Sequence, residues 1–294
     1  MKRIETTTSR TAEWTCLARA VSSLEANSHY RSDDHIARLL LPGFVKPLLH
    51  TPFLRTLYKA MVPKGLYNYV IARTKYVDAI FRRALAEQFD QILIFGAGFD
   101  TRALRFQHEL RNSRIFELDV PTTQKAKIAQ YLKRNLAMPS NLIFIAIDFD
   151  KESLPAKLGD AGFRKGQRSL FVLEGLLMYL QPDSVDATFR AIQEQAGERS
   201  WVVFDCVYAS VLRKEKLCYG ESGIMKSVTR AGERWYFAIE RGQLEQFLST
   251  YGLKPIDEKS AQDLEKAYFS EPSGRIVGRV NGAHCLVTAE RNGN

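Results

Sequence analysis

The chain has 294 residues, of which 45% are hydrophobic and 26% charged, and its formal net charge is +9. This balance is typical of a soluble globular protein with a substantial core, and it excludes a low-complexity chain. No apolar run approaches the roughly 18 residues of a membrane-spanning helix, and the N-terminal residues lack the apolar segment of a signal peptide. We therefore expect a cytoplasmic protein that does not enter a membrane.

The first part of the chain, residues 1–89, is predicted to form a helical cap over a ligand cleft. Apolar side chains recur at three- and four-residue spacing, as at Trp14, Leu17 and Val21, which is typical of an amphipathic helix. Two prolines and a glycine between residues 39 and 49 exclude one long helix there.

The remainder, residues 90–294, is predicted to be an α/β domain, because apolar strand-like runs alternate with helix-like segments. Such alternation argues for a parallel sheet covered on both faces. The predicted strands are residues 91–95, 114–118, 142–147, 168–173, 200–205, 253–257 and 283–289. No clear helix separates the last two strands, and the charged and aromatic segment 209–235 is interpreted as an inserted lid.

A short glycine turn at residues 96–101 follows the first predicted strand and precedes a helix. Its two glycines allow a sharp turn and a close backbone approach to a ligand, while the helix start offers unpaired N–H groups. Asp119 follows the second strand about 20 residues later, where a carboxylate can accept hydrogen bonds from ribose hydroxyls. The pattern predicts a nucleoside cofactor.

The glycine spacing disfavours a dinucleotide. A dinucleotide fingerprint carries a glycine or alanine three positions after Gly98, but Thr101 stands there. Asp100 also places a negative charge beside the expected position of the phosphates. Both features suit S-adenosylmethionine, whose sulfonium and ammonium groups are cationic.

Five ordered blocks resemble those of the leucine carboxyl methyltransferase-like family, which includes bacterial polyketide O-methyltransferases. The blocks are Arg73–Asp78, Gly96–Arg102, Glu117–Pro121, Asp148–Phe149 and Glu174–Leu180. The resemblance covers roughly residues 5 to 290. It implies a class I methyltransferase fold, a Rossmann-like sheet of seven strands with an antiparallel last strand, and S-adenosylmethionine as the cofactor.

The resemblance also implies a cofactor site at the carboxyl ends of the strands. The residues that it implicates are Arg73, Gly96, Ala97, Gly98, Asp100, Thr101, Glu117, Asp119, Asp148, Phe149 and Glu174. Asp119 aligns with the family's ribose carboxylate, whereas Glu117 is either a second ribose ligand or a solvated acid at a strand end.

Three further roles follow from the resemblance. Asp148 and Phe149 occupy the position that faces adenine in the family, although Asp148 could instead cap the next helix. Glu174 is implied to bind the ammonium group of the methionine moiety. Arg73 is implied to bind its carboxylate, for which a planar guanidinium is well suited.

The methyl acceptor is less well defined by the sequence. Arg10 and Tyr179 are candidate acceptor contacts, each with a purely structural role as the alternative. A carboxylate, with a pKa of about 4, needs no general base, whereas a phenol, with a pKa of about 10, usually does. None of the five blocks contains a histidine. The absence of a histidine favours a carboxylate acceptor. The departures from a protein-phosphatase-type methyltransferase, chiefly bacterial-looking blocks and a short cap, favour methyl esterification of a small-molecule acid over that of a protein C-terminus. Phenolic or hydroxyl O-methylation in a polyketide or other natural-product pathway is the alternative.

No metal site and no disulfide framework are predicted, because the four cysteines and five histidines show no ligand spacing. The lysines and arginines are dispersed, which disfavours a nucleic-acid partner. A non-catalytic cofactor-binding protein or a nucleic-acid-binding protein is the alternative from another functional class. The oligomeric state is not defined by the sequence.

Overall fold

The computed structural model describes residues 9–293, which are built around a seven-stranded sheet of order β3-β2-β1-β4-β5-β7-β6. β1 to β5 pair in parallel, whereas β7 lies antiparallel between β5 and β6. The strands are β1 (Gln91–Phe95), β2 (Arg114–Asp119), β3 (Leu142–Ala146), β4 (Ser169–Leu173), β5 (Trp201–Val207), β6 (Leu253–Lys259) and β7 (His284–Arg291). The predicted sheet and its antiparallel last strand are confirmed.

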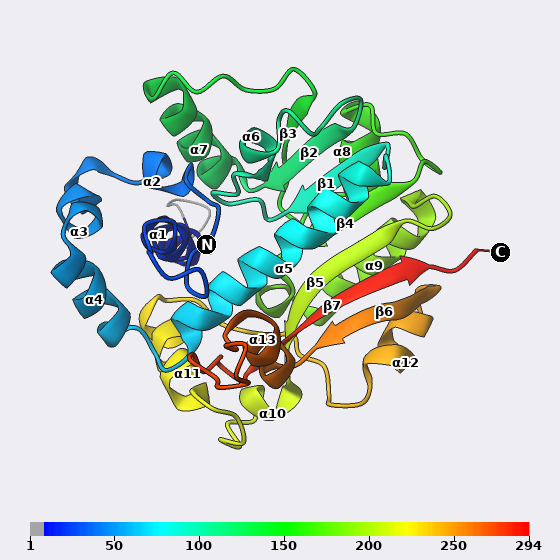
Figure 1. Cartoon of the computed structure of the whole chain (residues 1–294). Helices are drawn as coiled ribbons and strands as arrows, with labels where there is room; N and C mark the ends of the chain where they lie inside the picture. The colour runs from blue at the N-terminus through cyan, green and yellow to red at the C-terminus, as the bar shows by residue number, and fades with distance from the viewer. Residues whose placement is uncertain (1–8, 294) are drawn as a thin grey trace.

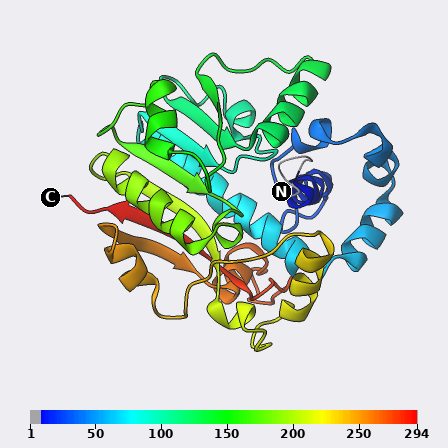
Figure 2. The same ribbon diagram turned by 180° about the vertical axis from the view of Figure 1, so that it is seen from behind.

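Helices cover both faces of the sheet. α5 (Leu66–Ala86) crosses one face in Figure 1, and α9 (Pro182–Gln195) crosses the other in Figure 2. Every residue of β1, β4 and β5 is buried, because a central parallel strand has helices above and below it. The other helices of this part are α6 (Arg102–Arg105), α7 (Pro121–Lys133), α8 (Leu154–Asp160), η3 (Leu177–Tyr179), α10 (Ala209–Leu212), α11 (Glu221–Arg230), α12 (Leu244–Ser249) and α13 (Ala261–Tyr268).

The N-terminal region is helical and interrupted, as predicted. It contains α1 (Arg10–Ser22), α2 (Ala37–Leu40), η2 (Gly43–Val45), α3 (Lys46–His50) and α4 (Pro52–Met61). α2, α3 and α4 form an arc on the outer side of α1 in both views (Figures 1 and 2). The predicted cap ends at residue 89 and therefore includes α5. In the structure α5 packs against β4, so it is one of the helices that cover the sheet.

The expectation that no helix separates the last two strands is wrong, because α13 lies between β6 and β7. A capping box begins this helix: the Ser260 hydroxyl accepts from the Asp263 N–H, and the Asp263 carboxylate accepts from the Ser260 N–H at 3.0 Å. Only two of its eight side chains, Ala261 and Leu264, are buried. A helix this short and polar has little apolar periodicity, so the capping box is a stronger sign of this helix in the sequence than its apolar pattern.

Candidate active site

A cavity of about 1230 Å³ lies where the parallel strands end. It is lined by residues that follow β1, β2, β3 and β4, together with residues of α1, α4, α5 and the 209–235 insertion. Open α/β sheets bind their ligands at this edge. Of the eleven residues implicated as cofactor ligands, all except Thr101 and Glu117 line this cavity.

The glycine turn has the backbone conformation that its sequence requires. Gly96 and Gly98 adopt φ values of +58° and +49°, which residues with a side chain rarely adopt. A Cβ atom on Gly98 would lie 3.2 Å from the Cβ of Ala12 on α1. The cap helix is therefore packed directly on the turn, and glycine is needed at residue 98 for both reasons.

Asp119 lies at the end of β2 beside this turn. Its two carboxylate oxygens accept hydrogen bonds from the backbone N–H groups of Gly98 and Val120, the latter at 2.7 Å. Each oxygen keeps a second lone pair that can accept from a ligand. Burial raises the pKa of Asp119 to about 6.

Glu117 is located away from the cavity. The side chain is buried, and its Oε2 atom lies 2.6 Å from the Nζ atom of Lys127 on α7. Burial raises the pKa of Glu117 to about 7. The ion pair between Glu117 and Lys127 connects β2 with α7. A buried, paired carboxylate does not match the alternative of a solvated acid at a strand end.

Asp100 and Thr101 have different surroundings. Asp100 lines the cavity and pairs with Arg102, whose backbone N–H also donates to it at 2.7 Å. Burial alone would raise the pKa of Asp100, but the Arg102 guanidinium lowers it to about 2. Thr101 is fully buried, and its hydroxyl donates to Asp34 at 2.6 Å. The charge of Asp100 is thus largely balanced within the protein.

Asp148 and Phe149 line the cavity after β3. Phe149 stacks on Phe95 with ring centroids 5.7 Å apart. Asp148 accepts from the Asp150 N–H at 3.1 Å, whereas the cap of α8 is Ser153, whose hydroxyl accepts from the N–H of Ala156. The alternative that Asp148 caps this helix does not match the structure.

Glu174, at the end of β4, belongs to a buried ionic network. Its Oε1 lies 2.9 Å from Nε of Arg73, and its Oε2 lies 2.8 Å from Nη1 of Arg102. Nη1 of Arg73 contacts Asp205 on β5 at 2.8 Å, while no described residue bonds to Nη2 of Arg73. Arg73 and Glu174 line the cavity, as does Asp100, which shares Arg102 with Glu174, so the network brings one arginine and two carboxylates to the cavity wall.

Asp205 is a residue that the sequence reasoning missed. It is a carboxylate inside the otherwise apolar strand Trp201–Val207, and its side chain is fully buried. The argument that singled out Glu174, that a buried acid needs a cationic partner, would have found Asp205 as well.

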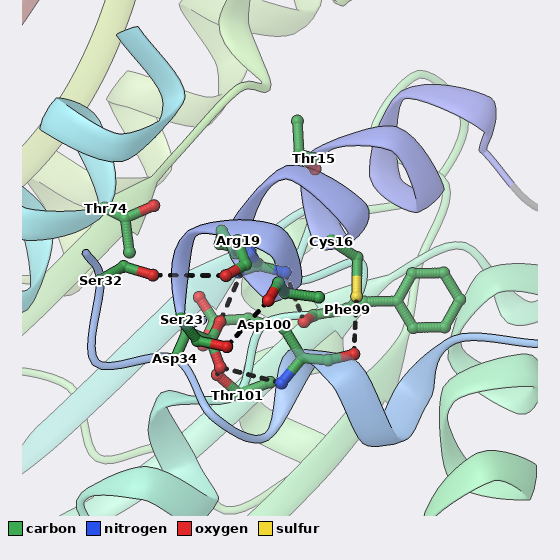
Figure 3. Close-up of polar contacts among 12 residues, drawn as sticks. Thr15, Cys16, Arg19, Ser23, Ser32, Asp34, Thr74, Phe99, Asp100 and Thr101 are labelled. Atoms are coloured by element: carbon green, nitrogen blue, oxygen red, sulfur yellow. Dashed lines mark hydrogen bonds and ion pairs between the residues drawn. The ribbon is translucent and has the colours of Figure 1, made fainter. Parts of the chain in front are cut away.

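Arg19 on α1 was also missed. Its Nη2 donates to the carbonyl oxygen of Phe99 in the glycine turn at 2.8 Å, and its Nε lies 3.5 Å from Oδ2 of Asp34 (Figure 3). Asp34 in turn accepts from Thr101. This cluster attaches the cap helix to the glycine turn, and nothing in the local sequence around Arg19 indicates it.

His284 is the third residue that was missed. β7 runs antiparallel to β5, so its first residue, His284, pairs with the last residue of β5 and reaches the cavity edge. The imidazole stacks on Tyr69 with centroids 4.2 Å apart and meets Trp235 edge-on at 5.5 Å. Its Nδ1 is buried without a hydrogen-bond partner among residues 9–293. Burial lowers the pKa of His284 to about 4, so the ring is neutral at pH 7.

The two candidate acceptor contacts lie where the cap meets the insertion. Arg10 and Tyr179 both line the cavity, and burial raises the pKa of Tyr179 to about 12. The Tyr179 hydroxyl lies 3.5 Å from that of Thr11, which donates to Glu233 of the insertion. Cap and insertion therefore touch each other across this part of the cavity.

Within residues 9–293, no group of three or more histidine, cysteine, aspartate or glutamate side chains is arranged to hold a metal ion. The helices in this part of the chain include none that is long and apolar enough to cross a membrane.

Comparison with known proteins relates the chain to relatives in bacteria. It is 27% identical over 201 residues to the "Putative S-adenosyl-L-methionine-dependent methyltransferase YktD" of Bacillus subtilis, covering 68% of this chain and 66% of that protein. It is 37% identical over 139 residues to a Mycobacterium tuberculosis protein of the same description, covering 47% and 45%. The chain thus matches between about half and two thirds of the length of these relatives.

Solved structures show the same fold. A DUF574 family protein from Streptomyces avermitilis superimposes with a TM-score of 0.62 at 14% identity, covering 99% of this chain and all of that one. A structure from Thermobifida fusca described as a "putative methyltransferase" gives a TM-score of 0.60 at 14% identity, covering 97% of this chain and 98% of that one. The family model described as leucine carboxyl methyltransferase matches residues 12–193. The chain therefore belongs to the leucine carboxyl methyltransferase family of S-adenosylmethionine-dependent enzymes.

Proposed function

We propose that the protein is an S-adenosylmethionine-dependent O-methyltransferase that converts a carboxylate of a small, largely apolar acid into a methyl ester. The observation that carries this proposal is a single cavity with two chemically different ends. One end, at the strand edge, is formed by the glycine turn and by charged side chains. The other, beneath the cap and the insertion, is lined by large apolar side chains such as Trp14, Leu66, Met178, Ile224 and Trp235, together with the charged residues Arg10, Glu13, Glu233 and Arg234.

The charged end suits the cofactor. Asp119 has lone pairs left for the two ribose hydroxyls, and Asp148 and Phe149 lie where the adenine would be placed. Glu174 would receive the ammonium group of the methionine moiety. Arg73 would bind its carboxylate through Nη2, since Nε and Nη1 are already used.

The volume supports two ligands. Pockets for one drug-sized ligand measure about 300–1,000 Å³, and this cavity measures about 1230 Å³. The apolar end can therefore hold an acceptor beside the cofactor. Arg10, Tyr179 and His284 are the polar side chains that we assign to contact it, and residues 209–235 are assigned as its lid.

His284 bears on which oxygen is methylated. A phenol has a pKa of about 10, so transferring its proton to a histidine of pKa about 4 is uphill by about 8 kcal/mol. A carboxylate presents an ionised oxygen at neutral pH without any such transfer, and a neutral imidazole can donate one N–H to it. This difference in the cost of proton transfer supports a carboxylate as the acceptor.

The proposed chemical step needs no acid or base from the protein. S-adenosylmethionine held at the charged end would supply the methyl group: a carboxylate oxygen of the acceptor would displace the sulfur at the methyl carbon in line, and the electron pair of the broken carbon–sulfur bond would stay on sulfur as a neutral thioether. The protein contributes by holding the two reactants in line at about 3 Å and by excluding water under the cap.

A phenolic or hydroxyl acceptor is the second candidate, favoured by the aromatic walls that Tyr69, Tyr179 and Trp235 provide. Screening small acids and phenols with methyl-labelled S-adenosylmethionine tests both. Mild alkali releases the label as methanol from an ester but leaves an aryl ether intact. Failure to bind the cofactor in calorimetry would contradict the proposal as a whole, whereas an alkali-stable product would replace the acid by a phenol.

A further inference from the structure

The cap presents an apolar face to the outside of the molecule. Phe44, Phe53, Leu57 and Met61 are 84%, 73%, 46% and 78% exposed, and we call these four residues the cap face. The last three follow one another at four-residue spacing on α4, so they lie along one side of that helix. α4 and α3 form the outer arc of the cap in Figure 1, with α1 between them and the sheet.

The segment that carries the cap face is strongly basic. Residues 35–64 contain Arg38, Lys46, Arg55, Lys59 and Lys64 but no aspartate or glutamate, so they supply five of the chain's nine net positive charges. Arg38, Lys46 and Lys64 are exposed and form no ion pair with any residue of the described part. Lys59 is paired with Glu25 at 2.5 Å.

Apolar side chains on one side of a helix, flanked by unpaired cations, are typical of helices that lie in the interface of an anionic bilayer. The same charges disfavour a second copy of the chain as the partner. In a symmetric dimer each patch would face its own copy, which would bring unpaired cations against cations.

We propose that the cap face docks on an anionic lipid surface, with Phe44, Phe53, Leu57 and Met61 inserted between head groups and Lys46 and Lys64 near the phosphates. This contact is peripheral and does not require a membrane-spanning helix. Phe44 and Met61 also line the cavity, so docking would bring its rim to the lipid.

The test is flotation of the full chain with vesicles of phosphatidylcholine containing 30% phosphatidylglycerol, compared with vesicles of pure phosphatidylcholine. At low salt we expect the chain to bind the anionic vesicles at least tenfold better than vesicles of pure phosphatidylcholine. Binding to the anionic vesicles should fall steeply in 0.5 M salt, because screening weakens the attraction. The triple variant Phe53→Ser/Leu57→Ser/Met61→Ser and the double variant Lys46→Glu/Lys64→Glu should each lose at least tenfold in binding.

Two matched controls separate this face from general basicity. Leu132→Ser removes another exposed apolar side chain, which is 63% exposed on α7. Lys165→Glu/Lys254→Glu reverses two exposed lysines, one shortly before β4 and one at the start of β6, where Lys254 lies 3.6 Å from Glu290. Both should float like the wild type, and all variants should keep their helical circular dichroism.

Three results would overturn the proposal. The first is a wild-type chain that does not float with anionic vesicles at low salt. The second is a cap-face variant, folded by circular dichroism, that floats as well as the wild type. The third is a dimer in light scattering that the triple variant dissociates, which would identify the face as an interface between copies. None of these measurements uses the methyltransferase activity, so they do not depend on the proposed reaction.

Discussion

Asp205 on β5 and Arg73 on α5 form a buried ion pair, with Nη1 of the arginine 2.8 Å from Oδ2 of the carboxylate. The same oxygen accepts from the Tyr69 hydroxyl at 2.6 Å, and the other accepts from the Gly175 N–H at 2.5 Å. Burial opposes ionisation of Asp205, but the charge of Arg73 lowers the pKa of this carboxyl below its usual value. One carboxylate thus connects α5 with the loop after β4.

Replacing this acid should destabilise the fold. Asp205→Ala leaves a buried arginine with one partner fewer, and breaking a buried ion pair from one side costs about 3–5 kcal/mol. Urea denaturation measures the loss. The control is Glu271→Ala, which removes the partner of the exposed Arg275 and should leave the urea midpoint close to that of the wild type, because a solvent-screened pair contributes little. Equal losses in the two variants would contradict the structural role of Asp205.

Gly98→Ala should weaken cofactor binding. A left-handed conformation costs a residue with a side chain about 1–2 kcal/mol, and the new methyl group would push against Ala12. We expect the affinity for S-adenosylhomocysteine to fall at least tenfold in calorimetry. Gly43→Ala, where nothing lies within 4 Å of the added atom, is the matched control and should bind normally. Normal binding by both variants would show that the turn is not the ligand's cradle.

The two acids of β2 should behave differently. Asp119→Ala removes a cavity carboxylate and should weaken S-adenosylhomocysteine binding by at least about 1 kcal/mol, the scale of one charge-assisted hydrogen bond. Glu117→Gln should leave binding within a factor of about two, because its partner is Lys127 and it does not line the cavity. Calorimetry at pH 7.5 separates the two, and a larger effect from Glu117 would reverse the assignment.

Cofactor affinity should depend on pH through Asp119. Burial raises its pKa to about 6, so the carboxyl is mostly protonated at pH 5. Ribose hydroxyls bind best to the ionised form, and a protonated group must first release its proton. The affinity for S-adenosylhomocysteine should therefore be constant above pH 7 and fall about tenfold per unit below pH 6. Asp119→Asn should abolish this dependence, and an unchanged slope in that variant would assign it to another group.

Stability at acidic pH should depend on His284. The folded pKa of about 4 lies below the ordinary value of 6.5, so the unfolded chain binds the proton more tightly. The folded state is then favoured above pH 6.5, and that advantage, up to about 3 kcal/mol, disappears as the pH falls toward 4. His284→Phe keeps a ring beside Tyr69 but cannot titrate. In urea denaturation at pH 6.5 and 4.5, this variant should lose less stability than the wild type, and an equal loss would contradict the prediction.

The sequence alone determined the order of the strands along the chain and the edge of the sheet at which the cavity lies. Apolar strands and a two-glycine turn are local patterns, because backbone conformation and burial on both faces restrict which residues can occur there. Gly96, Asp119 and Asp148 could be placed at this edge for that reason, since each directly follows a predicted strand, and Gly98 belongs to the turn that Gly96 begins. The C-terminal helix α13 was missed because a short polar helix leaves little periodic signal.

Only the tertiary structure decided which side chains face the cavity. Glu117 and Asp119 are two residues apart on β2, yet Lys127 on the following helix pairs with Glu117, and Asp119 remains at the cavity. His284 reaches the same cavity because β7 runs antiparallel, which brings its first residue beside the last residue of β5. Contacts between residues far apart in the chain depend on strand order and helix packing, and no local pattern around His284 or Arg19 encodes them.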